Sequence, residues 1–314
     1  MPNARTLRLG TRASNLALTQ SRMIAKALRK AHPGLRVKLV EISTTGDQVT
    51  DRPLQSFGGA GVFVKELENA LLDDRIDLAV HSLKDLPTRQ PRSLVLGAIV
   101  GREDTRDVAV IAGGKRLEEL PAGSVIGTGS TRRRAQLKAC YPHLQFAEIR
   151  GNVETRIRKV NEGQFAGTIL AMAGLKRLGI FVESMEVLPL NIMLPAPGQG
   201  ALGLECRAAD KRTRKLLKPL HNKEVALCVT AERTVLETLG SGCHLPLAAL
   251  GEIEKRDGRR TLHVSAVFGL PDASARVYAE IWGAPSRAKQ LGLMVAKNIL
   301  SRGGKEILEQ LQQE

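Results

Sequence analysis

The chain has 314 residues, enough for two or three domains, and its 43% hydrophobic and 25% charged residues are typical of a globular protein. Its 47 basic and 32 acidic residues give a formal charge of +15, which predicts an anionic partner without saying which one. An aromatic content of only 3% and the lack of zinc-finger or RNP patterns argue against nucleic acid, and no apolar run approaches the ~18 residues of a membrane span.

The first part of the chain alternates strands with amphipathic helices, which is the pattern of an α/β fold. Residues 1–5 lack the apolar core of a signal peptide, so we expect a cytoplasmic protein. Residues 6–11 form the first expected strand, and Ser14 stands where the N-cap of the next helix belongs. Helix breakers follow at 32–34, then a strand at 35–43, a helix at 63–72 and a strand at 77–82.

The same alternation restarts after residue 100. Strands are expected at 107–112, 124–127, 145–149 and 168–171, with helices that begin near Thr131, Val153 and Ala173. The run from Leu194 to Gly200 holds too many prolines and glycines for regular structure, which indicates a crossover between two α/β lobes. We therefore assign residues 1–100 and 200–218 to lobe 1, and residues 105–194 to lobe 2.

The pattern changes after His221 to that of a separate C-terminal domain, residues 222–314. A helix at 224–239 precedes three alternating strands, and Asp257-Gly258 between the first two is a hairpin signal. The strands are expected at 247–253, 261–267 and 276–282, and the last helix at 286–300. The expected fold class is α/β with two lobes, plus a C-terminal α+β domain with a three-stranded antiparallel sheet.

Polar and basic residues recur directly after the expected strands, where α/β folds place their ligand sites. Guanidinium groups pair with carboxylates in a two-point geometry, and helix N-termini offer free N–H groups to anions. Any single arginine could equally belong to a solvated helix face, but that reading explains the whole set less well. The residues are Arg12, Ser14, Ser82, Lys84, Asp85, Thr128, Ser130, Arg132, Arg133, Arg150, Arg156, Arg177 and Gln199.

Two of the side chains offer reactive chemistry, and each has a plain alternative. Asp85, a carboxylate beside the cationic Lys84, could stabilise a cationic intermediate, although Asp before proline is more often a simple turn residue. Cys243 lies in the glycine-flanked loop 240–246, so its thiol is either an accessible reactive group or a turn residue without a role. The residues alone leave both alternatives open.

The remaining cysteines and histidines point to structural roles. Cys140, Cys206 and Cys228 fall within expected elements and are interpreted as small buried residues. No CxxC pair or zinc-ligand spacing occurs, so we expect neither a disulfide framework nor a metal site. We expect His81, at the end of an apolar strand, to be a hydrogen-bonded structural residue.

Nearly the whole chain resembles the porphobilinogen deaminase family, whose activity is also called hydroxymethylbilane synthase. The matches follow one another in the same order as in the family, and their number argues against chance agreement. The matching motifs are 9–14 (LGTRAS), 61–67 (GVFVKEL), 81–87 (HSLKDLP), 127–133 (GTGSTRR), 150–153 (RGNV), 175–179 (LKRLG), 197–201 (PGQGA) and 231–233 (AER).

The resemblance implies a fold and a chemistry. The first two domains of the family look like a pair of periplasmic-binding-protein lobes with the active-site cleft between them. The third domain carries a cysteine that holds a dipyrromethane cofactor through a thioether, and the matching residue here is Cys243. Porphobilinogen loses ammonia to leave a cationic pyrrole, and the matching carboxylate that would stabilise this charge is Asp85. Four condensations then give hydroxymethylbilane.

The resemblance also assigns the polar residues and the partners. It implies a monomer that takes porphobilinogen as its substrate and passes its product to uroporphyrinogen III synthase. The implied cofactor-binding residues besides Cys243 are Ser82, Lys84, Thr128, Ser130, Arg132, Arg133 and Arg150. The implied substrate-binding residues are Arg12, Ser14, Arg156, Arg177 and Gln199.

Three positions depart from the family pattern. Ala60 stands where the family has a lysine, Gly129 where it has a serine, and the loop 240–246 reads GSGCHLP where the family has EGGC followed by any residue and VP. A degenerate deaminase that loads its cofactor but fails to elongate is therefore one alternative. A binding-only protein of the same two-lobed fold is another, although it would need neither the Cys243 loop nor a third domain.

Overall fold

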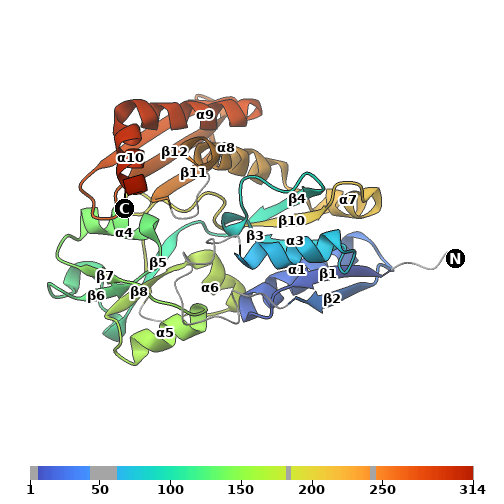
Figure 1. The fold of residues 1–314 in the computed structure, drawn as a ribbon, viewed down its shortest axis with the longest axis horizontal. Coiled ribbons are helices and arrows are strands. Elements are labelled where there is room, and N and C mark those ends of the chain that lie inside the picture. The colour runs from blue at the N-terminus through green and yellow to red at the C-terminus, as the bar shows by residue number, and fades with distance from the viewer. Residues whose placement is uncertain (1–5, 43–61, 182–184, 241–244, 314) are drawn as a thin grey trace. The chain divides into compact units, whose positions relative to one another are not determined.

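The computed structural model describes residues 6–42, 62–181, 185–240 and 245–313 (Figure 1). The chain divides into two compact units. Unit 1 comprises Met1–Arg102 and Gly200–Ala226, and unit 2 comprises Glu103–Gln199 and Leu227–Glu314. No helix in the described ranges is both long enough and apolar enough to cross a membrane.

Unit 1 is built on a five-stranded mixed sheet in the order β2-β1-β3-β10-β4. Strand β1 pairs in parallel with β2 and β3, whereas β10 runs antiparallel to β3 and β4. Ser14 caps the first helix as expected, because its side chain accepts a hydrogen bond from Ala17 N at 3.4 Å. The elements are β1 (Leu7–Thr11), α1 (Asn15–Ala31), β2 (Val37–Glu41), α3 (Val62–Leu72), β3 (Leu78–Ser82), β4 (Leu94–Arg102), β10 (Ala201–Arg207) and α7 (Lys211–Leu217).

The first sheet of unit 2 also has five strands, in the order β7-β6-β8-β5-β9. Its three parallel strands are β7, β6 and β8, and β5 runs antiparallel to β8 and β9. Buried residues such as Ile111, Ile126 and Ile169 form its core. The elements are β5 (Asp107–Ile111), β6 (Val125–Gly127), α4 (Thr131–Cys140), β7 (Gln145–Ala147), α5 (Val153–Asn161), β8 (Gly167–Ala171), α6 (Met172–Leu178) and β9 (Met185–Val187).

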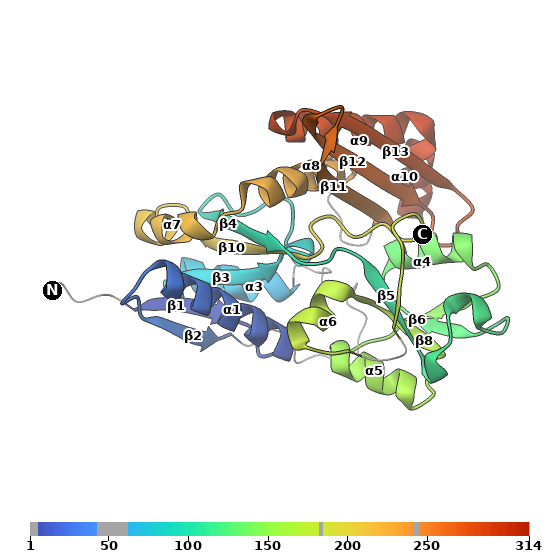
Figure 2. The ribbon, with the colours of Figure 1, turned by 180° about the vertical axis from the view of Figure 1, so that it is seen from behind.

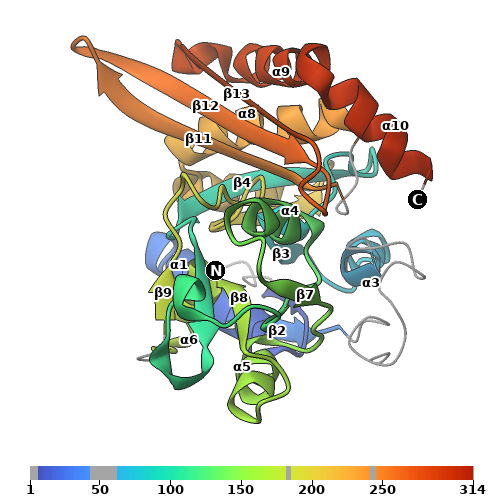
Figure 3. The ribbon, with the colours of Figure 1, turned by 90° about the vertical axis from the view of Figure 1, so that its left-hand side faces the viewer.

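The second sheet of unit 2 is antiparallel, with the order β11-β12-β13. Helices α8 and α9 cover one face of it (Figures 2 and 3), and their residues Val235 and Val295 share a core with Val264 of β12. Asp257 and Gly258 form the first hairpin turn with positive φ angles of 51° and 73°, as the Asp-Gly signal predicts. The elements are α8 (Lys223–Leu239), β11 (Leu247–Arg256), β12 (Arg259–Gly269), β13 (Arg276–Gly283), α9 (Ala288–Ile299) and α10 (Lys305–Gln313).

The predicted fold class is confirmed in the two mixed α/β sheets and in the three-stranded antiparallel sheet with its helices. The elements that the sequence patterns did not predict are β4, β9, β10, α7 and α10. Strand β10 pairs with β3 and β4, which lie about a hundred residues earlier in the chain. A local sequence pattern therefore does not predict β10.

Candidate functional site

The predicted site residues of unit 1 follow two neighbouring parallel strands. Arg12 and Ser14 come directly after β1, and Lys84 and Asp85 follow β3. Since β1 and β3 are parallel neighbours, their carboxyl ends lie at the same edge of the sheet. Ser82, the last residue of β3, is linked to α1 because its hydroxyl accepts a hydrogen bond from Gln20 Nε2 at 3.0 Å.

Asp85 stands at the end of a single 3₁₀ turn, Leu83–Asp85. Leu83 and Leu86 on either side of it are buried, whereas Asp85 itself is exposed. Gly203 on β10 leaves the space that Leu83 fills, since a Cβ atom there would lie 2.8 Å from Leu83 Cδ1. The turn is therefore anchored by apolar packing and presents its carboxylate to solvent.

His81 supports the same turn from within the sheet. Its Nε2 lies 3.0 Å from Glu205 Oε2 on β10, and both side chains are buried. The prediction that His81 is a hydrogen-bonded structural residue is confirmed.

The predicted site residues of unit 2 begin at the end of β6. Thr128 is buried, and its Oγ1 accepts a hydrogen bond from Ser130 N at 3.2 Å. The Ser130 hydroxyl caps α4 by accepting from Arg133 N at 3.4 Å. The turn 128–130 thus leads into the N-terminus of a ten-residue helix, where the helix dipole favours negative charge.

Arg132 and Arg133 of α4 are buried and converge on one carboxylate, Asp107 at the start of β5. Arg132 Nη2 donates to Asp107 Oδ2 at 2.7 Å, and Arg133 Nη2 donates to Asp107 Oδ1 at 2.8 Å. Gln199 Nε2 donates to the same Oδ1 at 2.9 Å. We call these residues, Asp107, Arg132, Arg133 and Gln199, the Asp107 cluster.

The Asp107 cluster carries two guanidinium groups and one carboxylate. Burial lowers the pKa of Arg132 and the neighbouring Arg133 lowers it further, while Asp107 opposes both effects. Arg133 Nε is buried and has no hydrogen-bond partner among the described residues. A buried site with excess positive charge and an unused N–H donor fits a carboxylate of a bound ligand.

Three further predicted arginines lie later in unit 2, Arg150 between β7 and α5, Arg156 on α5 and Arg177 on α6. Arg150 Nε pairs with Glu148 Oε1 at 3.0 Å, and Arg156 Nε donates to Gly151 O at 2.9 Å. Arg177 on α6 is partly buried, and this burial lowers its pKa.

Asp107 is the residue that sequence reasoning missed. It was included only as the first position of an expected strand, yet it is fully buried and accepts hydrogen bonds from three predicted site residues. The sequence DVAVI carries one signal that points to Asp107. A carboxylate at the start of an apolar strand is expected to be buried with it, and a buried charge requires partners.

The cysteines give a mixed outcome. Cys206 and Cys228 are buried as predicted, and burial raises the pKa of Cys206 to about 11, which keeps it a neutral thiol. The prediction for Cys140 was wrong, because it is exposed at the last position of α4. Cys243, His244 and Ala60 lie outside the described residues.

Among the described residues no group of three or more His, Cys, Asp or Glu could hold a metal ion.

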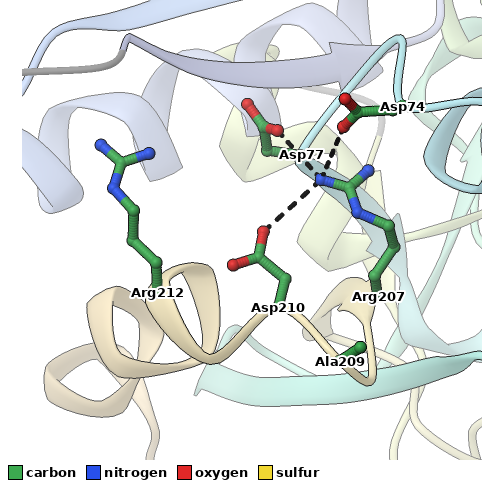
Figure 4. A pocket seen from close by; sticks show the side chains of 6 residues that line it. All are labelled: Asp74, Asp77, Arg207, Ala209, Asp210 and Arg212. Carbon is green, nitrogen blue, oxygen red and sulfur yellow. Dashed lines mark hydrogen bonds and ion pairs between the residues drawn. The ribbon is translucent and has the colours of Figure 1, made fainter.

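A second arginine–carboxylate cluster lines a pocket of about 320 Å³ in unit 1 (Figure 4). Asp77 is buried and pairs with Arg207 Nη2 at 3.0 Å and with Arg8 Nη2 at 2.7 Å. Asp74 and Asp210 also pair with Arg207, at 3.1 and 3.5 Å. Arg212 also lines the pocket, so this cluster, which we call the Asp77 cluster, has three carboxylates and, with Arg8, three guanidinium groups, and it offers no surplus positive charge to an anion.

Several solved structures are similar to part of this chain. The BenM effector binding domain with its effector benzoate is 17% identical, with a TM-score of 0.41, over 68% of this chain and 90% of that one. An ancestral cationic amino acid solute binding protein is 18% identical, with a TM-score of 0.40, over 68% and 87%. A ligand-binding component of an ABC-type import system from Staphylococcus aureus is 14% identical, with a TM-score of 0.39, over 75% of each chain.

Two family descriptions match the sequence itself. Residues 7–215 match "Porphobilinogen deaminase, dipyromethane cofactor binding domain", and residues 226–301 match "Porphobilinogen deaminase, C-terminal domain". Together they cover both mixed sheets and the antiparallel sheet. The chain therefore belongs to the porphobilinogen deaminase family, the transferases of haem biosynthesis that use a dipyrromethane cofactor and have hydroxymethylbilane synthase activity.

Proposed function

We propose specific roles for the residues of this deaminase: Asp85 is the catalytic carboxylate, Cys243 carries the dipyrromethane through a thioether, and the basic residues bind the carboxylates of cofactor and substrate. The observation that supports this proposal best is the Asp107 cluster. Its two guanidinium groups face one internal carboxylate, and Arg133 Nε has no partner among the described residues.

The residues proposed to hold the cofactor fit its chemistry. Dipyrromethane carries carboxylate side chains, and when bound it supplies the pyrrole carbon to which new units are joined. Buried arginines bind such carboxylates in fixed orientations, and the hydroxyl groups at the start of α4 add neutral hydrogen bonds. The proposed set is Ser82, Lys84, Thr128, Ser130, Arg132, Arg133 and Arg150.

The proposed substrate contacts are Arg12, Ser14, Arg156, Arg177 and Gln199. Porphobilinogen has an acetate and a propionate group, so each bound molecule needs cationic partners. Arg12 and Ser14 lie at the N-terminus of α1, which favours anions through its free N–H groups. Gln199 is buried and donates to Thr105 O and to Asp107, so we assign it a supporting contribution through the Asp107 cluster.

Asp85 is suited to an electrostatic role. Its turn is anchored by the buried Leu83 and Leu86, which keeps the exposed carboxylate in a fixed place. A preorganised carboxylate stabilises positive charge that develops on a pyrrole ring when ammonia leaves, without reorganising at that moment.

We further propose that the chain acts as a cytoplasmic monomer and hands hydroxymethylbilane to uroporphyrinogen III synthase. The proposed domains are lobe 1 (1–100 and 200–218), lobe 2 (105–194) and a cofactor-carrying domain (222–314). The two mixed sheets and the antiparallel sheet support this division.

The role of Asp85 is tested by the variant Asp85→Asn, with Asp257→Asn in an exposed hairpin turn as the control. We expect Asp85→Asn to keep its fold but to lose about 10²–10³-fold in kcat, the usual effect of removing one electrostatic stabiliser. Asp257→Asn should keep the wild-type rate. Equal rates of hydroxymethylbilane formation in all three proteins would remove Asp85 from the mechanism.

A further inference from the structure

We propose that Asp107 is the positioning residue of the cofactor site: it fixes the guanidinium groups of Arg132 and Arg133 and ties them to two of the chain segments that connect the units. This inference rests on the proposed role of the two arginines as carboxylate ligands. Neither the sequence motifs nor the family descriptions assign Asp107 a role.

The hydrogen bonds of the two arginines fix their orientation. Arg132 Nη1 donates to Leu194 O at 2.6 Å, and Arg133 Nη1 donates to Ile169 O at 2.7 Å. Their Nη2 groups both bind Asp107. Each guanidinium is therefore held at two points, and in Arg133 the buried Nε–H group has no partner among the described residues.

Asp107 also reduces the electrostatic repulsion between the two buried guanidinium groups. Two guanidinium groups on adjacent residues repel each other, and burial strengthens that repulsion. The Asp107 carboxylate offers one oxygen to each arginine and so leaves a single net positive charge. A second carboxylate, supplied by the ligand, would complete the charge balance.

Gln199 extends this arrangement to the chain connections. Its side-chain nitrogen donates to Asp107 Oδ1 at 2.9 Å and to Thr105 O at 2.7 Å. Thr105 lies in the connection from β4 to β5, and Gln199 lies in the connection from β9 to β10. Two of the three chain connections between the units are thus tied to the carboxylate that holds the arginines.

The Asp77 cluster provides a matched control. Asp77 is a buried carboxylate that pairs with two arginines, Arg8 and Arg207, but it lies outside the proposed site. Removing its charge removes a comparable structural interaction. A role of Asp107 that is only structural would therefore be reproduced by the change at Asp77.

The experiment measures how fast protein without cofactor gains the two-pyrrole mass increment when porphobilinogen is added. For Asp107→Asn we expect loading at least about tenfold slower than wild type, because displaced binding groups lose effective concentration and orientation. Asp77→Asn should lose a comparable amount of stability to urea and still load at the wild-type rate. Loading of Asp107→Asn at the rate of Asp77→Asn would overturn the proposal.

Two further variants keep the test decisive if Asp107→Asn does not fold. Asp107→Glu keeps the negative charge but moves the carboxylate by one methylene, so slow loading of this variant supports positioning and wild-type loading contradicts it. Arg133→Gln tests the underlying role of the arginine separately. If Arg133→Gln loads normally, the proposed cofactor contact itself fails, whatever Asp107 does.

Discussion

The Glu232 carboxylate accepts a hydrogen bond from Gly198 N at 2.7 Å, and through its other oxygen it accepts one from Gly251 N at 2.7 Å. Glu232 is fully buried on α8, Gly251 belongs to β11, and Gly198 lies in the connection that also carries Gln199. One side chain thus joins this connection to the C-terminal sheet and its helix.

The first prediction concerns this contact. Glu232→Gln replaces one acceptor oxygen by an N–H group that faces a backbone N–H donor, so we expect the free energy of unfolding to fall by about 1–3 kcal/mol. Urea denaturation measures the change. Glu252→Gln, at an exposed position of β11, is the control and should stay within about 0.5 kcal/mol of wild type. Equal stability of both variants would show that the Glu232 contacts contribute nothing.

The second prediction concerns the turn that holds Asp85. A Cβ atom at Gly203 would lie 2.8 Å from Leu83 Cδ1 and 2.9 Å from Leu96 Cδ2. Gly203→Ala therefore displaces the Leu83 side chain from its packing position against β10. We expect kcat to fall about tenfold or more, because the carboxylate two residues later is displaced.

The control for this change is Gly101→Ala, since a Cβ atom at that position of β4 meets no atom within 4 Å. It should have the wild-type kcat. If Gly203→Ala is as active as Gly101→Ala, the position of the turn does not depend on Leu83.

The third prediction is a pH dependence of stability. Burial would raise the pKa of Asp77, but hydrogen bonds from Arg8 and Arg207 outweigh it and lower the pKa to about 2. A carboxylate with a lowered pKa stabilises the fold fully above its unfolded pKa near 4, and this stabilisation is lost as the pH falls through the folded value. The contribution is about 2 kcal/mol.

Urea denaturation of wild type and Asp77→Asn at several pH values measures this effect. The difference in unfolding free energy between the two proteins should be constant from neutral pH to about pH 4 and should shrink by about 2 kcal/mol toward pH 2. Asp73→Asn, at an exposed position, should show no such convergence. A difference that stays constant down to pH 2 would exclude the Asp77 ion pairs as its source.

The fourth prediction concerns one departure from the family pattern. A Cβ atom at Gly129 would meet only Glu148 Cγ, at 3.7 Å, which is an ordinary contact, so Gly129→Ser should fold with unchanged stability. The new hydroxyl adds a hydrogen-bond donor between Thr128 and Ser130. Because we assign this turn to the carboxylates of the cofactor, protein without cofactor should gain the two-pyrrole mass increment faster in Gly129→Ser than in wild type, and kcat should stay the same. An unchanged loading rate would show that the family serine is dispensable here.

Much of the fold could be predicted from local patterns in the sequence. The N-cap at Ser14, the Asp257-Gly258 hairpin and the irregular run from Leu194 to Gly200 all stand where the patterns place them. The strands β4 and β10 could not be predicted in this way. Their partners in the sheet are distant in sequence, and in β10 burial on both faces removes the alternation that marks a strand.

The site could be predicted only in part, for a related reason. Residues at strand ends and helix starts are visible in the sequence, and Ser130, Arg132 and Arg133 stand there. Their common partner is not visible, because Asp107 precedes these arginines by 25 and 26 residues and precedes Gln199 by 92. Such pairings are set by tertiary packing and need a structure to be seen.

The attachment of the cofactor is tested by intact-protein mass spectrometry on wild type and Cys243→Ala, before and after brief exposure to porphobilinogen. We predict that wild type carries a two-pyrrole adduct and then gains successive one-pyrrole increments, while Cys243→Ala keeps the mass of the bare chain. An adduct that forms but never grows would indicate a degenerate deaminase. The same adduct on Cys243→Ala, or a bare wild type after prolonged exposure, would contradict the assignment of Cys243 as the point of attachment.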